Sequence, residues 1–186
     1  MQKSILWEGI QNDTDEHCAV NFLDDAIMVR SEIEGWAHGI PVYADYTLRL
    51  DKLWNVLEFD ISFHVRDTQH HYHLLRDEED NWTDASGKTY PEFKGCKYID
   101  ISLTPFTNSL PINGLFLPHG ESAQIDLVYV DIIANEIRKD HQKYTKAGHH
   151  NYHFENDGGN FTADIHVDND GFVTHYPELF NMIQPQ

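Results

Sequence analysis

Strict two-residue alternation of apolar and polar side chains runs through two long stretches of this sequence. In residues 42–50 and again in residues 57–65, every second side chain is apolar and the intervening ones are mostly polar or charged. Side chains of a β-strand point alternately to opposite faces, so each stretch predicts a strand with one buried face. A chain with two such strands in succession is expected to fold around a sheet.

Shorter runs of the same kind recur along the chain, with glycine, asparagine and aspartate between most of them. Further strands are expected at residues 18–23, 26–33, 71–75, 99–104, 115–117, 125–130, 152–154, 161–167 and 172–176. Short turns join successive strands into antiparallel meanders, and the absence of alternating helical segments argues against a parallel βαβ sheet. The sequence predicts a mainly β fold with little helix.

Residues 133–144 can be interpreted in two ways. Ile133, Ile137 and Tyr144 lie at helical spacing, but the apolar stripe is narrow. Arg138, Gln142 and Tyr144 fit one face of a long strand equally well. We interpret the segment as a strand.

Charge restricts the partners that this chain can bind. Its 13 Lys and Arg against 31 Asp and Glu give a formal charge of -18. Nucleic acid and anionic membrane surfaces would be repelled, whereas an uncharged lipid could enter an apolar cavity. No nucleic-acid partner is expected.

Two cysteines, Cys18 and Cys96, lie far apart and fit no zinc or redox spacing. We expect both to be buried thiols. The first ten residues do not resemble a signal peptide, and no apolar run is long enough to span a membrane. A cytoplasmic location without a cofactor is the expectation.

A weak internal repeat is visible in the order of three motifs. Residues 70–73, 80–83 and 90–93 are echoed by residues 149–153, 160–162 and 176–180. We predict one domain over residues 1–186, with a pseudo-duplication into halves of about 1–95 and 96–186, although chance similarity in an aromatic-rich β protein is the alternative.

Histidine clusters at residues 70–73 and 149–153 offer candidate metal ligands. His71 and His73 would share one face of a strand, and His150 and His153 lie in the second cluster. A metal-dependent hydrolase would need a third ligand from elsewhere. Histidines on a solvated strand face are more often bystanders, so no metal is the first expectation and the hydrolase is an alternative.

Residues 99–112 combine alternation with an unusual density of small polar groups. Asp100, Ser102 and Thr104 would share one face, and Thr107 and Asn108 follow the bend at residue 105. Such carboxylate, hydroxyl and amide groups suit a hydroxyl-rich ligand. Alternatively, residues 107–109 bond their own backbone in a loop held by two prolines.

The same segment carries a family resemblance. The chain resembles the bacterial "putative glycolipid-binding" family over nearly its whole length. The resemblance lies in residues 46–54, 95–96, 99–112, 142–144 and 167–180. The resemblance implies a spiral antiparallel β-roll, curved like a barrel and built from two similar halves, and a glycolipid as ligand. It brings no catalytic residues. Asn113 and Gly114 depart from the basic residues that commonly follow the motif in that family.

Three functional hypotheses follow. The first is non-enzymatic binding of an amphiphile. Its apolar wall would be Trp54, Phe59, Phe63 and Tyr129, and its polar contacts would come from the polar side chains of residues 100–108. Phe59 and Phe63 individually are better explained as core. The second is the metal-dependent hydrolase. The third is a homodimer or scaffold that pairs through an exposed sheet edge.

Overall fold

The computed structural model describes residues 1–156 and 159–183, and most of these residues lie in strands. The strands are β1 (Gln2–Gly9), β2 (Asp13–Phe22), β3 (Ile27–Ala37), β4 (Ile40–Leu50), β5 (Val56–Val65), β6 (Thr68–Arg76), β7 (Trp82–Asp84), β8 (Tyr98–Ile101), β9 (Ser122–Asp131), β10 (Glu136–Lys146), β11 (Asn151–Asn156), β12 (Thr162–Val167), β13 (Val173–Tyr176) and β14 (Phe180–Ile183). Within residues 1–156, the helical segments are two 3₁₀ turns, η1 (Pro91–Phe93) and η2 (Phe106–Asn108), and the short helix α1 (Ser109–Gly114).

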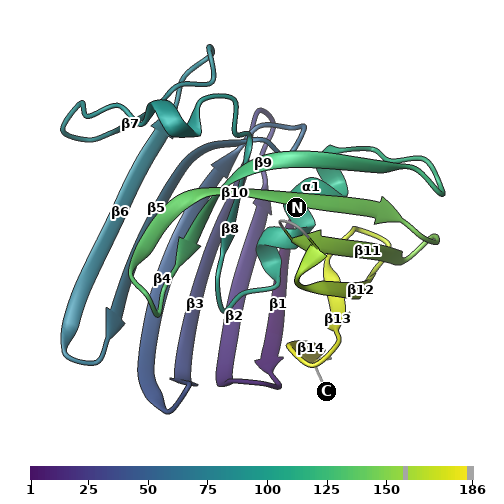
Figure 1. Ribbon diagram of the computed structural model, residues 1–186, viewed down its shortest axis with the longest axis horizontal. Helices are drawn as coiled ribbons and strands as arrows, with labels where there is room; N and C mark the ends of the chain where they lie inside the picture. Colours follow the sequence, from purple (N-terminus) through teal and green to yellow (C-terminus); the bar gives the residue numbers. More distant parts are fainter. Residues whose placement is uncertain (157–158, 184–186) are drawn as a thin grey trace.

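All strands belong to one curved, open sheet in the order β7-β6-β5-β4-β3-β2-β1-β14-β13-β12-β11-β10-β9-β8. Strands β1 to β7 therefore form one block, β8 to β14 form the other, and β1 pairs with β14 where the blocks meet. Figure 1 shows the long strands of the first block standing behind β9 and β10, which cross in front of them. The predicted β-roll is confirmed. Whether the halves arose by duplication stays a prediction.

The alternating stretches form strands as predicted. In β4, the side chains of Val42, Ala44, Tyr46, Leu48 and Leu50 are buried, and the intervening ones lie on the outer face. Strand β5 pairs with β4 and buries its own alternate residues on the same side. Together these inner faces supply much of the larger hydrophobic core.

Strand β10 resolves the ambiguity at residues 133–144 in favour of the extended interpretation. It pairs antiparallel with β9 over ten residue pairs from Glu136 to Thr145, and with β11 on its other side. Asp140, Gln142 and Tyr144 are buried on one face, as two-residue periodicity requires. A helix at residues 133–143 is excluded.

The strand expected at residues 99–104 is shorter than predicted, and the chain bends before the expected position at Pro105. Strand β8 ends at Ile101, and Leu103 adopts a positive φ of 69°, a conformation that turns the chain out of the sheet. The chain then forms η2 and α1 before it returns in β9, which runs parallel to β8. The β8–β9 pair is the exception to the antiparallel pattern. A parallel pair needs a connection longer than a hairpin turn, and here η2 and α1 lie within that connection.

Other differences from the sequence analysis concern single elements. Residues 115–117 form no strand; Phe116 has a φ of 50° and an exposed side chain. Strands β1 and β14 were not predicted, although they join the two blocks. Alternation in β1 is interrupted at Lys3 and Ser4, so its pattern is visible over few residues.

The core divides into two clusters. The larger includes buried residues of β1–β6, η1, β8, η2 and β9, and the smaller joins Ile112 of α1 to residues of β10–β14. Cys18 and Cys96 are buried free thiols in the larger cluster, as predicted. No helix among the described residues has the length and hydrophobicity required to cross a membrane.

Candidate functional site

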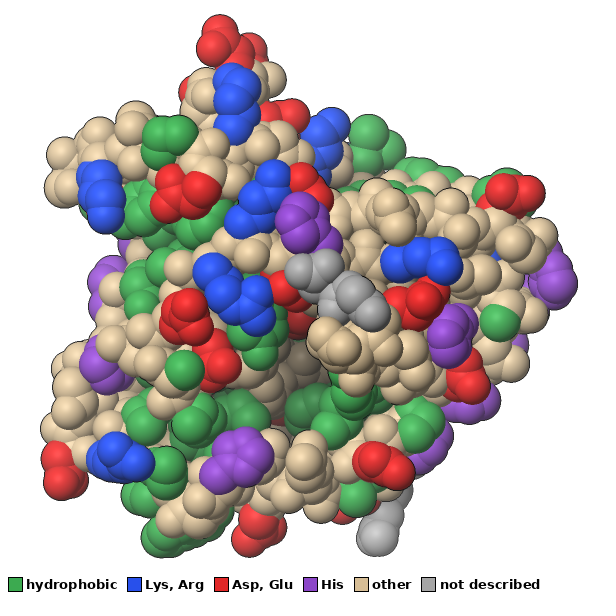
Figure 2. Space-filling view, viewed as in Figure 1, with side chains coloured by type: hydrophobic (Ala, Val, Ile, Leu, Met, Phe, Trp, Pro, Cys, Tyr) green, Lys and Arg blue, Asp and Glu red, His purple; other side chains and the backbone are tan. Residues whose placement is uncertain are grey.

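A cavity of about 490 Å³ opens between the second block of the sheet and the turns at one end of the first. Its volume lies within the range of about 300–1,000 Å³ that is usual for small-molecule sites. Figure 2 shows this face hollowed near its centre, with hydrophobic side chains along part of the depression. The lining residues are Gln11, Asn12, His38, Asp100, Ile101, Ser102, Leu103, Thr104, Asn108, Tyr129, Asp131, Ile133, Ala134, Arg138, Asp140, Gln142, Phe154, Asn156, Phe161, Tyr176, Leu179 and Phe180.

A directed chain of hydrogen bonds ends on Asp100. Asn108 Nδ2 donates to the Tyr144 hydroxyl at 2.9 Å, and that hydroxyl donates to Gln142 Oε1 at 3.1 Å. Gln142 Nε2 donates to Asp100 Oδ2 at 2.7 Å, while Thr107 Oγ1 donates to Asp100 Oδ1 at 3.0 Å. Every donor in the chain points toward the carboxylate, an arrangement that orients Asp100 firmly in the cavity wall.

Burial nevertheless raises the pKa of Asp100 to about 6, although the hydrogen bonds from Gln142 and Thr107 act in the opposite direction. The charge of Asp140 also raises it, and that of Arg138 lowers it. Asp100 is therefore largely ionised at pH 7 and gains its proton in a mildly acidic solution.

Ser102 and Thr104 lie beside Asp100 but serve the turn that follows β8. Ser102 Oγ accepts a hydrogen bond from the Ile132 amide at 2.9 Å, and Thr104 Oγ1 accepts one from the Phe106 amide at 3.0 Å. Both residues also line the cavity. Both hydroxyls thus hold the local backbone and also face the cavity, and their binding of a ligand stays a prediction.

Arg138 is the cavity's guanidinium, and it is already engaged. Its Nη1 donates to Asp140 Oδ1 at 2.6 Å, and its Cζ atom lies 4.6 Å from the centre of the Tyr129 ring. The aromatic face and the carboxylate together hold the guanidinium against the wall.

Another part of the cavity lining is aromatic. Phe154 lies with its ring centre 6.1 Å from that of Phe161 and 6.3 Å from that of Tyr176. Phe180 extends the cluster at 6.3 Å from Tyr176, and Tyr144 connects it to the polar chain at 5.2 Å from Phe154. These rings come from β10 to β14, whereas Asp100 to Thr104 come from β8 and the turn after it. Polar and apolar walls are therefore supplied by different elements.

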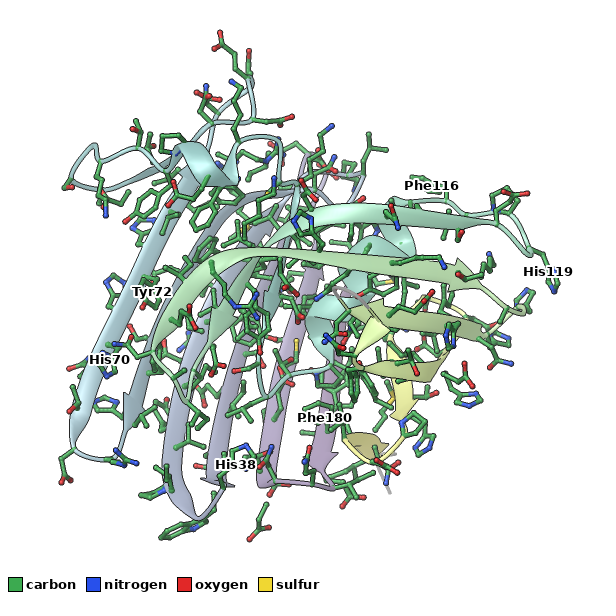
Figure 3. The ribbon with its side chains drawn as sticks, in the orientation of Figure 1. His38, His70, Tyr72, Phe116, His119 and Phe180 are labelled. Carbon is green, nitrogen blue, oxygen red and sulfur yellow. The ribbon has the colours of Figure 1, made fainter. Side chains whose placement is uncertain are left out.

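Turns of the first block complete the rim. Gln11 and Asn12 belong to the β1–β2 turn and His38 to the β3–β4 turn, and the His38 amide donates to Asn12 Oδ1 at 3.4 Å. Figure 3 shows His38 and Phe180 at this end of the molecule, far from Phe116 and His119. The cavity mouth therefore has contributions from both blocks.

Five of the seven predicted ligand-binding residues line this cavity: Asp100, Ser102, Thr104, Asn108 and Tyr129. Thr107 is fully buried behind Asp100, where its hydroxyl also accepts the Ile101 amide hydrogen at 3.3 Å. Trp54 lies elsewhere, with its ring between those of Phe22 and Phe172.

Phe59 and Phe63, expected as either wall or core, belong to the core. Both are fully buried in the larger cluster, where Phe59 packs against Trp82 with ring centres 5.6 Å apart. Neither residue lines the cavity. The core interpretation that the sequence favoured is confirmed.

The first histidine cluster is engaged with carboxylates on the neighbouring strand. His71 Nε2 lies 3.0 Å from Asp60 Oδ1, and His73 Nε2 lies 2.9 Å from Glu58 Oε1. Figure 3 shows His70, of the same strand, at the left edge of the molecule, whereas His38 lies at its lower end.

The second histidine cluster lies on and beside β11, separated in the sheet from β6 by β5 to β1 and β14 to β12. His153 Nδ1 lies 2.7 Å from Asp164 Oδ1, and His149 Nδ1 lies 2.9 Å from His150 Nε2. Within residues 1–156 and 159–183, no group of three or more His, Cys, Asp or Glu side chains is arranged to hold a metal ion. The described residues therefore offer no set of metal ligands in support of the hydrolase hypothesis.

Several cavity residues were not predicted. Arg138, Asp140 and Gln142 share one face of β10, and the two-residue pattern of that segment could have placed them beside Asp100 if the pairing of β8, β9 and β10 had been known. The aromatic residues Phe154, Phe161 and Tyr176 carried no comparable signal, because aromatic side chains on strands are usually core.

Asn113 and Gly114, the departure from the expected basic residues, lie outside the cavity. Asn113 Nδ2 donates to the Ser109 carbonyl oxygen at 3.1 Å. A Cβ atom at Gly114 would lie 2.4 Å from the Tyr98 hydroxyl and 2.9 Å from the Leu53 carbonyl oxygen, so a larger side chain there needs a shift of the neighbouring backbone. The departure therefore affects packing at the end of α1.

Taken together, these features define a spiral β-roll with a cavity lined by both polar and aromatic side chains. The sequence matches the model of the family described as "Putative glycolipid-binding" over residues 4–182. The chain belongs to this family. No match was found among curated proteins.

A crystal structure of a DUF1089 family protein from Pseudomonas aeruginosa is similar to this chain. The two share 34% sequence identity with a TM-score of 0.79, and the alignment covers 90% of this chain and 92% of the other. The similarity therefore extends to almost the entire fold.

Proposed function

We propose that this protein binds an amphiphilic small molecule, of the glycolipid class, without carrying out a chemical reaction on it. The observation that carries the proposal is the division of one cavity into a polar wall from β8–β10 and an aromatic wall from β11–β14. An amphiphile has the same division, so each part of the ligand would meet a wall of its own polarity. The family description supports the same ligand class.

The head group would lie against Asp100, Ser102, Thr104, Asn108 and Tyr129. These side chains offer a carboxylate, hydroxyls and an amide within one wall, and a sugar presents several hydroxyls that both donate and accept. Thr107 would act through Asp100, whose carboxylate it orients with its 3.0 Å hydrogen bond.

The apolar part of the ligand would lie against Phe154, Phe161, Tyr176 and Phe180. Phe161 is 38% exposed, although it packs on two other aromatic rings of the cluster. Covering such a surface with an alkyl chain removes apolar area from water and is favourable by roughly 25 cal/mol per Å². Trp54 is left out of the proposed site because its ring packs against Phe22 and Phe172.

Isothermal titration with octyl β-glucoside, below its micelle concentration, tests the proposal. We expect saturable binding to the unmodified chain and affinity weakened by about tenfold in Phe161→Ala, which corresponds to about 1.4 kcal/mol. Phe116→Ala is the matched control, because Phe116 is another exposed phenylalanine, 69% accessible, away from the cavity. Its affinity should equal that of the unmodified chain.

Two results would refute amphiphile binding in this cavity. One is the absence of saturable heat with octyl β-glucoside together with repeated recovery of no amphiphile when lipid is extracted from the purified protein. The other is equal weakening by Phe161→Ala and Phe116→Ala. The expected cytoplasmic location and the homodimer stay predictions, and a mass measurement in solution tests the latter.

A further inference from the structure

The charges that line the cavity do not balance. Asp100, Asp131 and Asp140 face it with Arg138 as the guanidinium among the lining residues. Arg138 is paired with Asp140 at 2.6 Å, and Asp131 Oδ1 accepts the Ala134 amide hydrogen at 2.9 Å in its own turn. Asp100 is left without a cation.

The contacts of Asp100 confirm this imbalance. Its two hydrogen-bond donors, Thr107 and Gln142, are both neutral. Among the ion pairs of the described residues, none includes Asp100. A carboxylate removed from water without a cationic partner is costly, and a ligand that supplies the missing charge recovers part of that cost.

Aromatic side chains lie near the same carboxylate, because Tyr129 of β9 is the register partner of Asp100 and Tyr176 lines the same cavity. The pKa of Tyr129, Tyr144 and Tyr176 is raised first by burial and next by the negative charge of Asp100, so all three phenols are close enough to be affected by that charge. Tyr129 and Tyr176 also line the cavity. A carboxylate with aromatic side chains nearby is a favourable environment for an ammonium group, which is attracted by both.

We propose that the head group of the ligand carries a protonated amine that pairs with Asp100, as an amino sugar would. This proposal rests on the proposed function and specifies its ligand class. Hydroxyls of the sugar would meet Ser102, Thr104 and Asn108, and the ammonium would donate to the carboxylate oxygens of Asp100. An anionic head group is disfavoured, because Arg138 is already neutralised by Asp140.

A matched pair of ligands tests the proposal at pH 7 on the unmodified chain. Octyl 2-amino-2-deoxy-β-glucoside differs from octyl β-glucoside only in that an amine replaces the 2-hydroxyl group. Its N-acetylated form keeps a nitrogen at that position but carries no charge. We expect the amine to bind at least about tenfold tighter than either neutral ligand, as a charge-assisted hydrogen bond provides.

The variant Asp100→Asn should reduce this preference to within about twofold, because the amide keeps the shape of the side chain and removes its charge. Asp45→Asn, on the outer face of β4, is the control and should keep the full preference. Circular dichroism and thermal unfolding show whether each variant folds. The ligand comparison on the unmodified chain does not depend on either of them.

Each outcome has a separate meaning. Equal affinity for all three ligands on the unmodified chain overturns the amine proposal and leaves amphiphile binding intact, whereas no binding by any of them overturns both. A preference for the amine that survives Asp100→Asn refutes the role of Asp100.

The preference should also decline as pH falls through about 6, where Asp100 gains its proton. The charged and titratable groups that face Asp100 are Asp140, Arg138 and Tyr144 of β10, Tyr129 of β9 and Tyr176 of β13. A preference that is unchanged at pH 5 would contradict pairing with an ionised Asp100.

Discussion

The two blocks of the sheet present inner faces of different kinds, and a carboxyl group in each shows the difference. In the first block, Glu16 Oε1 accepts hydrogen bonds from Ser31 Oγ at 2.6 Å and from the Tyr46 hydroxyl at 2.7 Å. These residues come from β2, β3 and β4, and all three are buried. In the second block, each carboxylate oxygen of Asp100 accepts one hydrogen bond, from Thr107 or from Gln142, and the half-buried side chain lines the cavity.

The difference shows how one architecture separates stability from binding. Long strands β1–β6 fill their inner face with large side chains, while the shorter strands β11–β14 gather aromatic rings around a space. The Tyr46 hydroxyl, which donates to Glu16, also lies 3.3 Å from Thr104 Oγ1 in the cavity wall. The hydrogen bonds around Glu16 therefore reach the cavity wall through Tyr46. We infer that substitutions in the first block or in the buried part of the β8–β9 crossover alter stability first, whereas those of cavity-lining residues in the second block alter binding first.

Phe106→Ala should have the largest effect on stability. Phe106 is fully buried in η2 and packs against Trp7, Tyr46 and Phe172, at the point where both blocks meet the crossover. Truncating a buried phenylalanine costs about 3–5 kcal/mol. Urea unfolding measures the change, and a loss below about 1 kcal/mol would show that the crossover does not hold the blocks together.

Glu16→Gln should stabilise the protein at alkaline pH. Burial raises the pKa of Glu16 to about 7 from an ordinary 4.5, despite hydrogen bonds from Ser31, Thr104 and Tyr46. The folded state therefore binds the proton more tightly than the unfolded state, and stability falls as pH rises from about 4.5 to 7. The full difference is about 3 kcal/mol.

We expect Glu16→Gln to recover about this amount at pH 8 and little at pH 4.5, as measured by urea unfolding at both values. Glu32→Gln, at an exposed position on β3, is the control. Equal pH dependence in the unmodified chain and the Glu16 variant would show that Glu16 titrates as it does in water.

Asn108→Ala should have an intermediate effect. It removes the 2.9 Å hydrogen bond to the Tyr144 hydroxyl and loosens the chain that leads through Gln142 to Asp100. We expect a loss of about 1–2 kcal/mol in stability together with weaker binding of octyl β-glucoside. Loss of stability with unchanged affinity would assign Asn108 a structural role alone.

Phe161→Ala should have the smallest effect on stability, less than about 1 kcal/mol, because the side chain is 38% exposed. For each kcal/mol of stability lost, Phe161→Ala should nevertheless weaken the binding of octyl β-glucoside more than Asn108→Ala does. Thermal unfolding and titration of the same preparation give both quantities, and a large loss of stability would place Phe161 in the core instead.

Much of this account could be predicted from the sequence, and the gaps have physical causes. The strands β4 and β5 were visible because each has one buried face, and the polar segment after Tyr98 was visible because its alternation breaks at Pro105. The pairing of β1 with β14 and the approach of Gln142 to Asp100 join residues far apart in sequence. Local patterns carry no information about such contacts. Trp54 looked like a cavity residue because an aromatic side chain suits either a core or a ligand.

The most direct test of the central claim is a titration of isotope-labelled protein with octyl β-glucoside, followed by the chemical shifts of backbone amides. Binding in the cavity predicts the largest shifts in residues 100–108, in β10–β14, and at Asn12 and His38 in the rim. Small shifts are expected in β5 and β6. Largest shifts around His71 and His73, or at Phe116, would contradict a ligand site between the two blocks.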